Sequence, residues 1–414
     1  MEIRPILSAL LRSKTGAILV ALQVAISLAI LANALHIVNL RQAVAARPIG
    51  MTGENALFYI NVRHLRDGDH NEQIATQKAE TATLRAVGGV TSVAFANQIP
   101  LSRNGSTNSV AADRKQLNES AGASYYYSPD SLVKTWGLTL VEGRDFRPDE
   151  VIEVDNNAAD AADQNPRSVI ITRALGQKVW PGATSFVGKT LYFGTGEKAE
   201  DAKVVGVVEH LQTQSGEVGE RGEYSTIVPM RLSNGYGIAY TMRAEAGQLE
   251  RVMKEAEAAL RKNASGPVIL RVKSIADERK ERYRADNAMS WMLVTVSVLL
   301  LLITASGIVG MASLWVTQRR KQIGVRRALG ARRVDILRYF ITENFMITSV
   351  GVAAGVLLAI GLNQLLVSKL EMTRLPLEYL LAGAGVFWAL GVCAVYGPAW
   401  RAASISPATA TRSA

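Results

Sequence analysis

The segment whose residue types most suggest chemistry is 183–190, which fits the loose phosphate-binding pattern A-x-x-x-x-G-K-T. In a working phosphate-binding loop a strand comes before the glycines and a helix follows, so that the helix N-terminal amides hold the phosphates. Here Pro181-Gly182 comes before the segment, and Leu191-Tyr192-Phe193 after it favours a strand. We therefore expect a turn that leads into a β-strand, and no nucleotide site.

The histidines and the cysteine offer little more chemistry. Among His36, His64, His70 and His210, none shows metal-ligand spacing; a weak cation site at His64 and His70, with two aspartates between them, stays open as an alternative. Cys393, the only cysteine, lies in an apolar stretch, and no Ser/His/Asp or Cys/His arrangement is supported. The sequence predicts no catalytic residue, no metal and no cofactor in this chain.

The elements that must position any functional residue are mostly apolar. The chain has 414 residues, of which 48% are hydrophobic and 20% charged. Four stretches contain no Asp, Glu, Lys or Arg: 15–40, 287–318, 344–368 and 379–400. Because about 20 helical residues cross about 30 Å of hydrocarbon, each stretch predicts a transmembrane helix. A simple soluble enzyme is excluded.

The charge distribution orients these spans. Residues 41–286 hold 31 basic and 31 acidic side chains, so the net charge of +10 comes from the short flanking pieces. These are 1–14 and 401–414, each +2, and the loop 319–343, at +6, whereas 369–378 is neutral. Loops rich in Lys and Arg stay in the cytoplasm, which places both termini and 319–343 inside and the block 41–286 outside. No aromatic-interleaved basic face accompanies the charge, so we expect no nucleic-acid partner.

The first span has a rival interpretation. Basic residues come before it, and Ala32-Asn33-Ala34 has the small-x-small form of a signal-peptidase site. The uncharged run is long for a signal peptide and continues to Leu40, which favours a retained helix. Either interpretation leaves the large block outside the cell.

The external block predicts an α+β domain made in two parts. A first set has strands at 57–62 and 90–96 and a helix at 71–87; a second has strands at 224–231, 237–243 and 267–272 and a helix at 247–262. The two sets look like halves of one layer. Between them, about 105–220 forms an inserted subdomain with strands at 168–172, 189–193 and 202–209 and a short helix at 173–180. Within it, the acidic, Asn- and Ala-rich segment 148–166 predicts a mobile loop.

Helical stems are expected next to the membrane. The polar helix 274–286 has no obvious break before the span that ends at Gln318, and 36–47 can extend the first span. Two such helices would carry motion between the external domain and the cytoplasm.

The loop 319–343 is the most informative segment. It mixes eight basic residues with an apolar set, and Gly324 and Gly330 interrupt the helical pattern. An amphipathic segment in contact with membrane lipids is one interpretation. A short surface helix that fits a groove on a cytoplasmic partner is the other.

Residues 319–344, RRKQIGVRRALGARRVDILRYFITEN, resemble the cytoplasmic loop of the MacB/FtsX-type permeases of ABC transporters, R-x-x-E-I-G-x-R-[RK]-A-[LI]-G-A followed by an amphipathic run. Pro398, Ala399, Arg401, Ala402, Ala403, Ile405 and Pro407 match that family's closing P-A-x-R-A-[AS]-x-[IL]-x-P motif. Residues 168–211 also resemble its extracytoplasmic domain. The resemblance implies four transmembrane helices and, between the first two, a large extracytoplasmic α+β domain of the MacB-like periplasmic core type.

The resemblance also implies a function in the bacterial inner membrane. The coupling element that docks on a separate ABC ATPase subunit would be Ile323, Gly324, Arg326, Arg327, Leu329 and Gly330. ATP and Mg would be bound by that ATPase, and a second permease chain, a periplasmic adaptor and an outer-membrane channel are further expected partners. The cargo would be a peptide, antibiotic or lipoprotein; the alternative is a signalling subunit that senses a ligand or activates a cell-wall hydrolase. Gln322 stands where the family commonly has Glu, which puts in doubt any salt bridge from that position.

Two membrane features remain. Gly351 and Gly355 form a GxxxG pattern, which lets helix backbones approach closely, within this chain's own bundle or at a subunit interface. Glu378, at the outer edge of the fourth span, is expected to reach the headgroup region, with a functional intramembrane carboxylate as the alternative.

Overall fold

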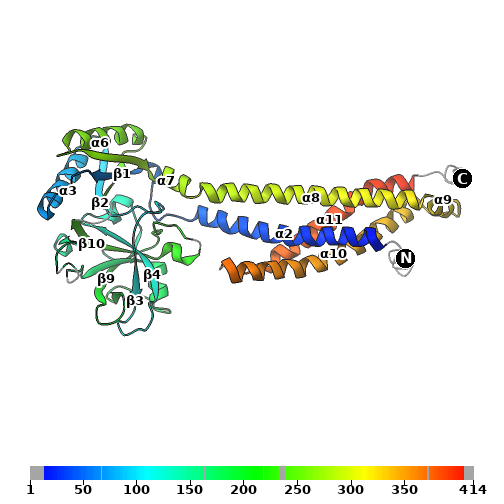
Figure 1. Cartoon of the computed structure of the whole chain (residues 1–414), viewed down its shortest axis with the longest axis horizontal. Coiled ribbons are helices and arrows are strands. Elements are labelled where there is room, and N and C mark those ends of the chain that lie inside the picture. The colour runs from blue at the N-terminus through cyan, green and yellow to red at the C-terminus, as the bar shows by residue number, and fades with distance from the viewer. Residues whose placement is uncertain are drawn as a thin grey trace. The chain divides into compact units, whose positions relative to one another are not determined.

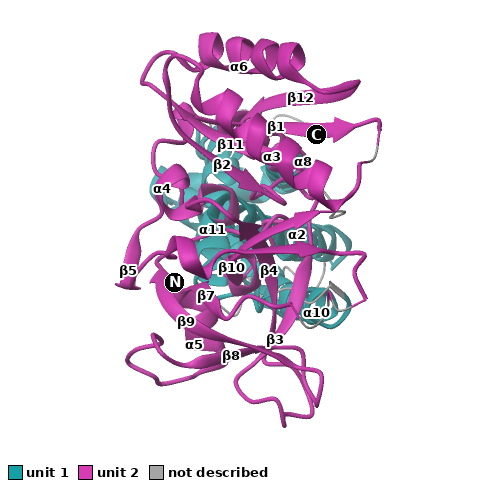
Figure 2. Cartoon of the chain, turned by 90° about the vertical axis from the view of Figure 1, so that its left-hand side faces the viewer, with its two compact units in different colours: residues 1–43, 286–414 teal, residues 44–285 magenta. Residues whose placement is uncertain are grey.

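The computed structural model describes residues 14–66, 68–159, 161, 164–217, 219–233, 238–370 and 373–404. The predicted cytoplasmic pieces at 1–13 and 405–414 lie outside this range, and so do Ile405 and Pro407 of the closing motif. The chain divides into two compact units, one of residues 1–43 with 286–414 and one of residues 44–285, coloured separately in Figure 2.

The first unit is a bundle of long helices that run lengthwise beside one another (Figure 1). They are α2 Lys14–Ala46, α8 Arg284–Gln318, α10 Arg333–Leu370 and α11 Leu377–Ala403, with the short α9 Arg320–Ala328 between α8 and α10. The four long ones are long and apolar enough to cross a membrane. The predicted fold class, four membrane helices with a large α/β domain between the first and the second, is confirmed.

Apolar packing and a few polar contacts hold the bundle together. Leu28 of α2 and Phe387 of α11 are fully buried in its core. The hydroxyls of Ser27 and Thr304 lie 2.9 Å apart and join α2 to α8, and Asn33 donates to the Ala359 carbonyl of α10 at 3.1 Å. Because lipid tails are as apolar as leucine, such contacts between small and polar residues specify which helix faces pair.

The second unit contains a four-stranded antiparallel sheet of order β12-β1-β11-β2, built from β1 Leu57–His64, β2 Val90–Ala96, β11 Ala239–Ala244 and β12 Val268–Ser274. Helices α3 His70–Arg85 and α6 Leu249–Asn263 accompany it (Figure 2). The helix predicted at 247–262 is confirmed as α6, and it buries one face, formed by Val252, Ala256 and Leu260. The expectation that early and late segments share one layer is confirmed for these elements.

The other sheet has eight strands, in the order β4-β3-β8-β9-β7-β10-β6, with β5 paired to β9. Its strands are β3 Thr107–Ala111, β4 Ala121–Ser128, β5 Leu140–Gly143, β6 Ile152–Asp155, β7 Ser168–Thr172, β8 Thr190–Phe193, β9 Glu200–Val208 and β10 Ser225–Ser233. Helices α4 Leu132–Trp136 and α5 Arg173–Val179 and the 3-10 turns η1 Glu54–Ala56, η2 Pro148–Glu150 and η4 Glu220–Glu223 complete the unit. Because β4 also pairs with β10, the path returns on itself as a closed barrel.

The strand expected at 224–231 was assigned to the wrong sheet. It is β10, which pairs with β7 on one side and with β4 and then β6 on the other. Eight of its nine residues are buried, as suits a strand with neighbours along both sides. The inserted part therefore continues past residue 220 to the end of β10.

The prediction of a mobile loop over 148–166 was wrong for its first half. Residues 152–155 form β6, which pairs in parallel with 230–233 of β10, a partner far away in sequence. Just before it, Glu150 accepts two hydrogen bonds from the Arg144 guanidinium, at 2.7 and 2.9 Å. That guanidinium lowers the pKa of Glu150 to about 2. Residues 160, 162 and 163 lie outside the described residues.

The predicted unbroken helix from 274 to 318 is also wrong. Helix α7 Ile275–Arg282 ends before Tyr283, whose backbone leaves helical geometry at φ −96° and ψ 4°, and α8 starts at Arg284. The Tyr283 ring is buried, and its hydroxyl donates to Gln212 Oε1 at 3.1 Å. The break coincides with the contact between Tyr283 and Gln212, which lies far away in sequence. Helical periodicity, which is a local pattern, therefore cannot predict it.

A buried acid of α3 contacts a histidine of the four-stranded sheet. Glu80 of α3 lies 3.3 Å from His64 Nε2 and accepts a hydrogen bond of 2.6 Å from the Tyr240 hydroxyl. The contact with Glu80 raises the pKa of His64 above its usual 6.5, although burial opposes the shift.

We predict that His64→Gln destabilises this unit most at acidic pH. A raised folded-state pKa means that the stabilisation is fully present below the unfolded pKa of about 6.5 and is lost as pH rises through the folded value. Thermal unfolding midpoints of wild type and variant, measured from pH 5.5 to 8.5, should converge towards alkaline pH. The companion variant Glu80→Gln should remove the same pH dependence, and a constant difference across the range would contradict the prediction.

Candidate functional site in the loop between α8 and α10

The loop predicted as a coupling element folds as a short helix with a fixed turn. Helix α9 ends where Gly330 takes a φ of +96°. Gly330 N donates to Arg327 O at 3.2 Å, and Ala331 N donates to Arg326 O at 3.0 Å, the hydrogen-bond pattern of a Schellman motif. A non-glycine residue with positive φ costs about 1–2 kcal/mol, which explains the glycine. Gly324, in contrast, lies inside α9 and does not interrupt it.

One face of α9 is turned into the bundle. Ile323 and Gly324 are buried, and Ile323 shares a core cluster with Ile336 and Phe340 at the start of α10. Two of the six residues predicted to couple to a partner are thus packed inside this chain. Their contacts fix α9 to the membrane helices.

The other predicted coupling residues are turned outward to different degrees. Leu329 is 83% exposed, Arg326 and Gly330 are exposed, and Arg327 is half-buried with Nη1 donating to the Ala331 carbonyl at 3.3 Å. Val325, 52% exposed, adds a second outward apolar side chain. The turn therefore presents exposed apolar residues among cations.

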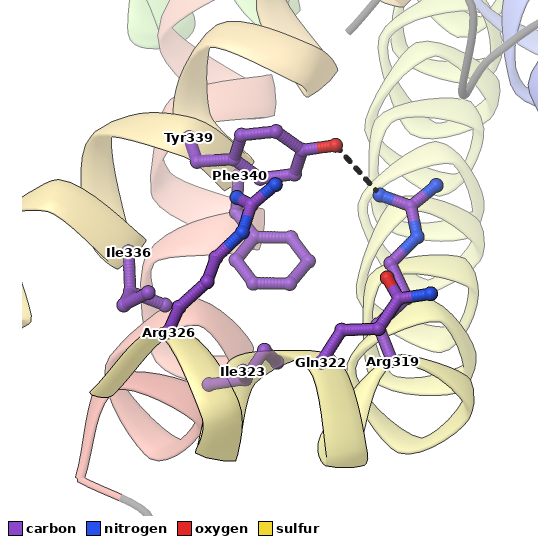
Figure 3. A pocket seen from close by; sticks show the side chains of 7 residues that line it. All are labelled: Arg319, Gln322, Ile323, Arg326, Ile336, Tyr339 and Phe340. Carbon is purple, nitrogen blue, oxygen red and sulfur yellow. Dashed lines mark hydrogen bonds between the residues drawn. The ribbon is translucent and has the colours of Figure 1, made fainter. Parts of the chain in front are cut away.

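A buried ion pair, which the sequence analysis missed, ties the two ends of the loop together. Arg319 Nη1 lies 2.7 Å from Glu343 Oε2, and Glu343 is only 1% exposed. The same guanidinium nitrogen donates to the Tyr339 hydroxyl at 3.3 Å, as Figure 3 shows. A usable signal was present in the sequence, because Glu343 is one of only two acids in a loop with eight basic residues.

Most of the remaining cations of the loop have no anionic partner. In the part of the chain that the structure describes, no ion pair involves Arg320, Lys321, Arg326, Arg333 or Arg338. Asp335 caps the start of α10 by accepting from the Arg332 backbone N–H at 2.9 Å. The loop thus carries uncompensated positive charge on its surface.

The GxxxG pattern of α10 lies against α2 of the same chain. A Cβ on Gly351 would come within 2.7 Å of the Ala21 carbonyl oxygen and 2.8 Å of Val24 Cβ. One on Gly355 would come within 3.0 Å of the Ala25 carbonyl oxygen. The two glycines let the helix backbones approach.

The other candidate chemistry has ordinary structural roles. Segment 183–190 leads into strand β8, and Phe186 within it is buried and stacks on Trp180 with ring centroids 6.2 Å apart. His64 contacts Glu80, whereas His70 Nδ1 contacts the Ser233 hydroxyl at 2.8 Å. Among the described residues, no group of three His, Cys, Asp or Glu could hold a metal ion.

Comparison with protein families agrees with this arrangement of helices and sheets. Residues 17–262 match the MacB-like periplasmic core domain, and residues 294–407 match the FtsX-like permease C-terminal domain. The chain belongs to the MacB/FtsX-type permease family. It is a multi-pass protein of the inner membrane.

Several curated relatives of this MacB/FtsX-type permease are named for export. The macrolide export ATP-binding/permease protein MacB of Syntrophobacter fumaroxidans is 29% identical over 203 residues, 47% of this chain and 28% of that protein. MacB of Chromobacterium violaceum is 26% identical over 283 residues, 67% of this chain and 41% of that protein. The pyoverdine export ATP-binding/permease protein PvdT of Pseudomonas syringae pv. syringae is 38% identical over 135 residues, 31% and 20% of the two chains. This chain spans less than half the length of each of them.

We predict that Gly351→Val destabilises the permease bundle by about 1–3 kcal/mol, the usual cost of overpacking, because the new side chain collides with the α2 backbone. Gly361→Val on the same helix is the matched control, since a Cβ there meets nothing within 4 Å. Thermal unfolding of the detergent-solubilised protein should show a lower midpoint for Gly351→Val alone. Equal midpoints for the two variants would mean that the α2 contact is absent.

Proposed function

We propose that this chain is the permease subunit of an ABC transporter that works with a separate ATPase subunit. ATP and Mg would be bound by that ATPase, and this chain would supply no catalytic residue. The observation that carries the proposal is the turn after α9, where Leu329 stands 83% exposed among cations on a helix otherwise fixed to the bundle. An exposed apolar side chain on a rigid element is typical of a residue that inserts into a partner's groove.

The coupling would be mechanical. Ile323 anchors α9 in the core, and the Arg319–Glu343 pair joins the end of α8 to α10, so a displacement of α9 moves both helices. Helix α8 has 35 residues without a break, about 50 Å at 1.5 Å per residue. Its first residues belong to the extracytoplasmic unit, which gives the motion a continuous covalent path.

The charge distribution and the family support the proposed orientation and partners. The +6 loop and both termini would face the cytoplasm, and residues 44–285 the periplasm. A second permease chain, the same or a paralogue, would complete the machine. The relatives named for macrolide and pyoverdine export support export of a periplasmic substrate such as an antibiotic, a peptide or a lipoprotein, through an adaptor and an outer-membrane channel.

We predict that Val325→Glu combined with Leu329→Glu abolishes co-purification of the ATPase subunit. Both side chains are exposed, so the variant should insert and fold normally while losing its apolar contacts to the partner. Each buried contact of this type contributes about 1.5–3 kcal/mol, so loss of both should lower the affinity at least about a hundredfold. The measurement is affinity purification from native membranes, with partners identified by mass spectrometry.

Leu117→Glu is the control, because Leu117 is 97% exposed but lies between β3 and β4 of the other unit. It should leave the ATPase bound. If the double variant kept the ATPase, the docking role of the turn would be wrong. If a cell-wall hydrolase were recovered in place of an adaptor, the export part of the proposal would fail and the coupling part would remain.

A further inference from the structure

A small cavity opens between α9 and the start of α10, on the side of α9 that faces the bundle. Its volume is about 20 Å³, and it is lined by Arg319, Gln322, Ile323, Arg326, Ile336, Tyr339 and Phe340 (Figure 3). A space of this size accepts one water molecule or one oxygen atom of a larger group. It therefore fits the tip of a ligand whose remainder stays outside.

The polar groups that line the cavity are mainly hydrogen-bond donors. Arg326 stacks on the Tyr339 ring with its guanidinium carbon 5.2 Å from the ring centroid, and the Arg319 guanidinium carbon lies 6.0 Å from the same ring. The Tyr339 hydroxyl accepts from Arg319, which leaves its own hydrogen available to donate. Gln322 adds an amide that can donate as well, and no carboxylate belongs to the lining.

The charges around the cavity are unbalanced. Two guanidinium groups share one aromatic ring, and the carboxylate of Glu343 pairs with Arg319. Arg326 forms no ion pair with any residue that the structure describes. An anion placed between the two guanidinium groups would relieve their repulsion and would gain charge-assisted hydrogen bonds.

The positions of the uncharged stretches place the cavity next to the expected level of the lipid headgroups. Arg319 directly follows the uncharged stretch 287–318, and Tyr339 comes five residues before the stretch that starts at 344. The apolar floor of Ile323 and Phe340 continues into the bundle core. Three further cations of the loop are close to the lining residues in sequence and form no ion pair among the described residues: Lys321, Arg333 and Arg338. Each such residue near an anionic surface adds about 1 kcal/mol of attraction for anionic lipid.

From these observations we infer that the cavity binds one phosphate oxygen of an anionic phospholipid from the leaflet next to the loop. Arg326 and Tyr339 are the binding residues, and Arg319 with Gln322 completes the donor set. Such a lipid would cross-link α9 to α10 from the membrane side. The exposed turn at Leu329 would stay free for a protein partner, so the two surfaces of α9 would have different ligands.

The test measures lipid binding to the purified full-length chain by native mass spectrometry, with phosphatidylglycerol, phosphatidylcholine and inorganic phosphate as separate probes. Arg326→Gln should weaken phosphatidylglycerol binding about tenfold, the loss expected for one charge-assisted hydrogen bond. Tyr339→Phe, which keeps the ring and changes no charge, should weaken it severalfold. Arg333→Gln removes the same charge outside the cavity. The purified protein in detergent has no anionic membrane surface next to Arg333, so this variant should change binding less than about twofold.

The unfolding midpoint of each variant without anionic lipid reports whether that variant folds. If Arg326→Gln does not fold, the lipid binding of Tyr339→Phe tests the inference in its place. Equal losses for Arg326→Gln and Arg333→Gln, with none for Tyr339→Phe, would show attraction to surface charge alone and overturn the inference. So would displacement of phosphatidylglycerol by millimolar inorganic phosphate, which would make the free anion the ligand. Equal binding of phosphatidylcholine and phosphatidylglycerol would also overturn it.

Discussion

Charged groups are costly in hydrocarbon, and this constraint determines how the molecule is arranged. Each of the four long helices carries an uncharged stretch, and charged residues stand directly beyond its ends. Arg319 and Glu343 stand at the two points where the loop leaves the spans, and the structure pairs them. Glu343 is almost fully buried, and its second carboxylate oxygen makes no hydrogen bond among the described residues, so removal of Arg319 would leave a buried carboxylate without its ion-pair partner. The loop is therefore closed by a buried ion pair between its two ends.

The remaining structure of the loop follows from that closure. With its ends joined, α9 has to turn back within a few residues, and Gly330 supplies the backbone conformation for the return. Ile323 then faces the core, while Leu329 and Val325 face away from it. A rigid helix with one buried face and one exposed apolar edge suits mechanical transmission better than a flexible loop would. Because the opposite face of α9 is packed on the bundle, a force on the exposed edge would move the helix as a whole.

How much of this could be predicted depended on whether the information was local. Spans were predictable because hydrocarbon imposes a length and excludes charge within one continuous segment, and the stripe of Val252, Ala256 and Leu260 on α6 was predictable from helical periodicity. Strand β6 was missed because its partner, β10, lies some eighty residues away in sequence, and the helix break at Tyr283 was missed because it accompanies a contact with Gln212. In the candidate site, residue types pointed to the loop as a whole. Which of its residues are buried was decided by the packing of α9 on α10, so the inward direction of Ile323 and the role of Tyr339 could not be read from spacing.

The two faces of the loop also separate two kinds of recognition. Apolar contact at Leu329 would be insensitive to salt, whereas the guanidinium groups around Tyr339 act through charge and hydrogen bonds, which salt weakens. A ligand on the inner side would change how firmly α9 is held, and through the Arg319–Glu343 pair it would change how α8 and α10 respond to a push on the outer side. Because both ligands act on one rigid helix, each would alter the affinity for the other by the same factor at equilibrium. The composition of the membrane next to the loop would then modulate its coupling to the ATPase subunit without any change in the docking residues.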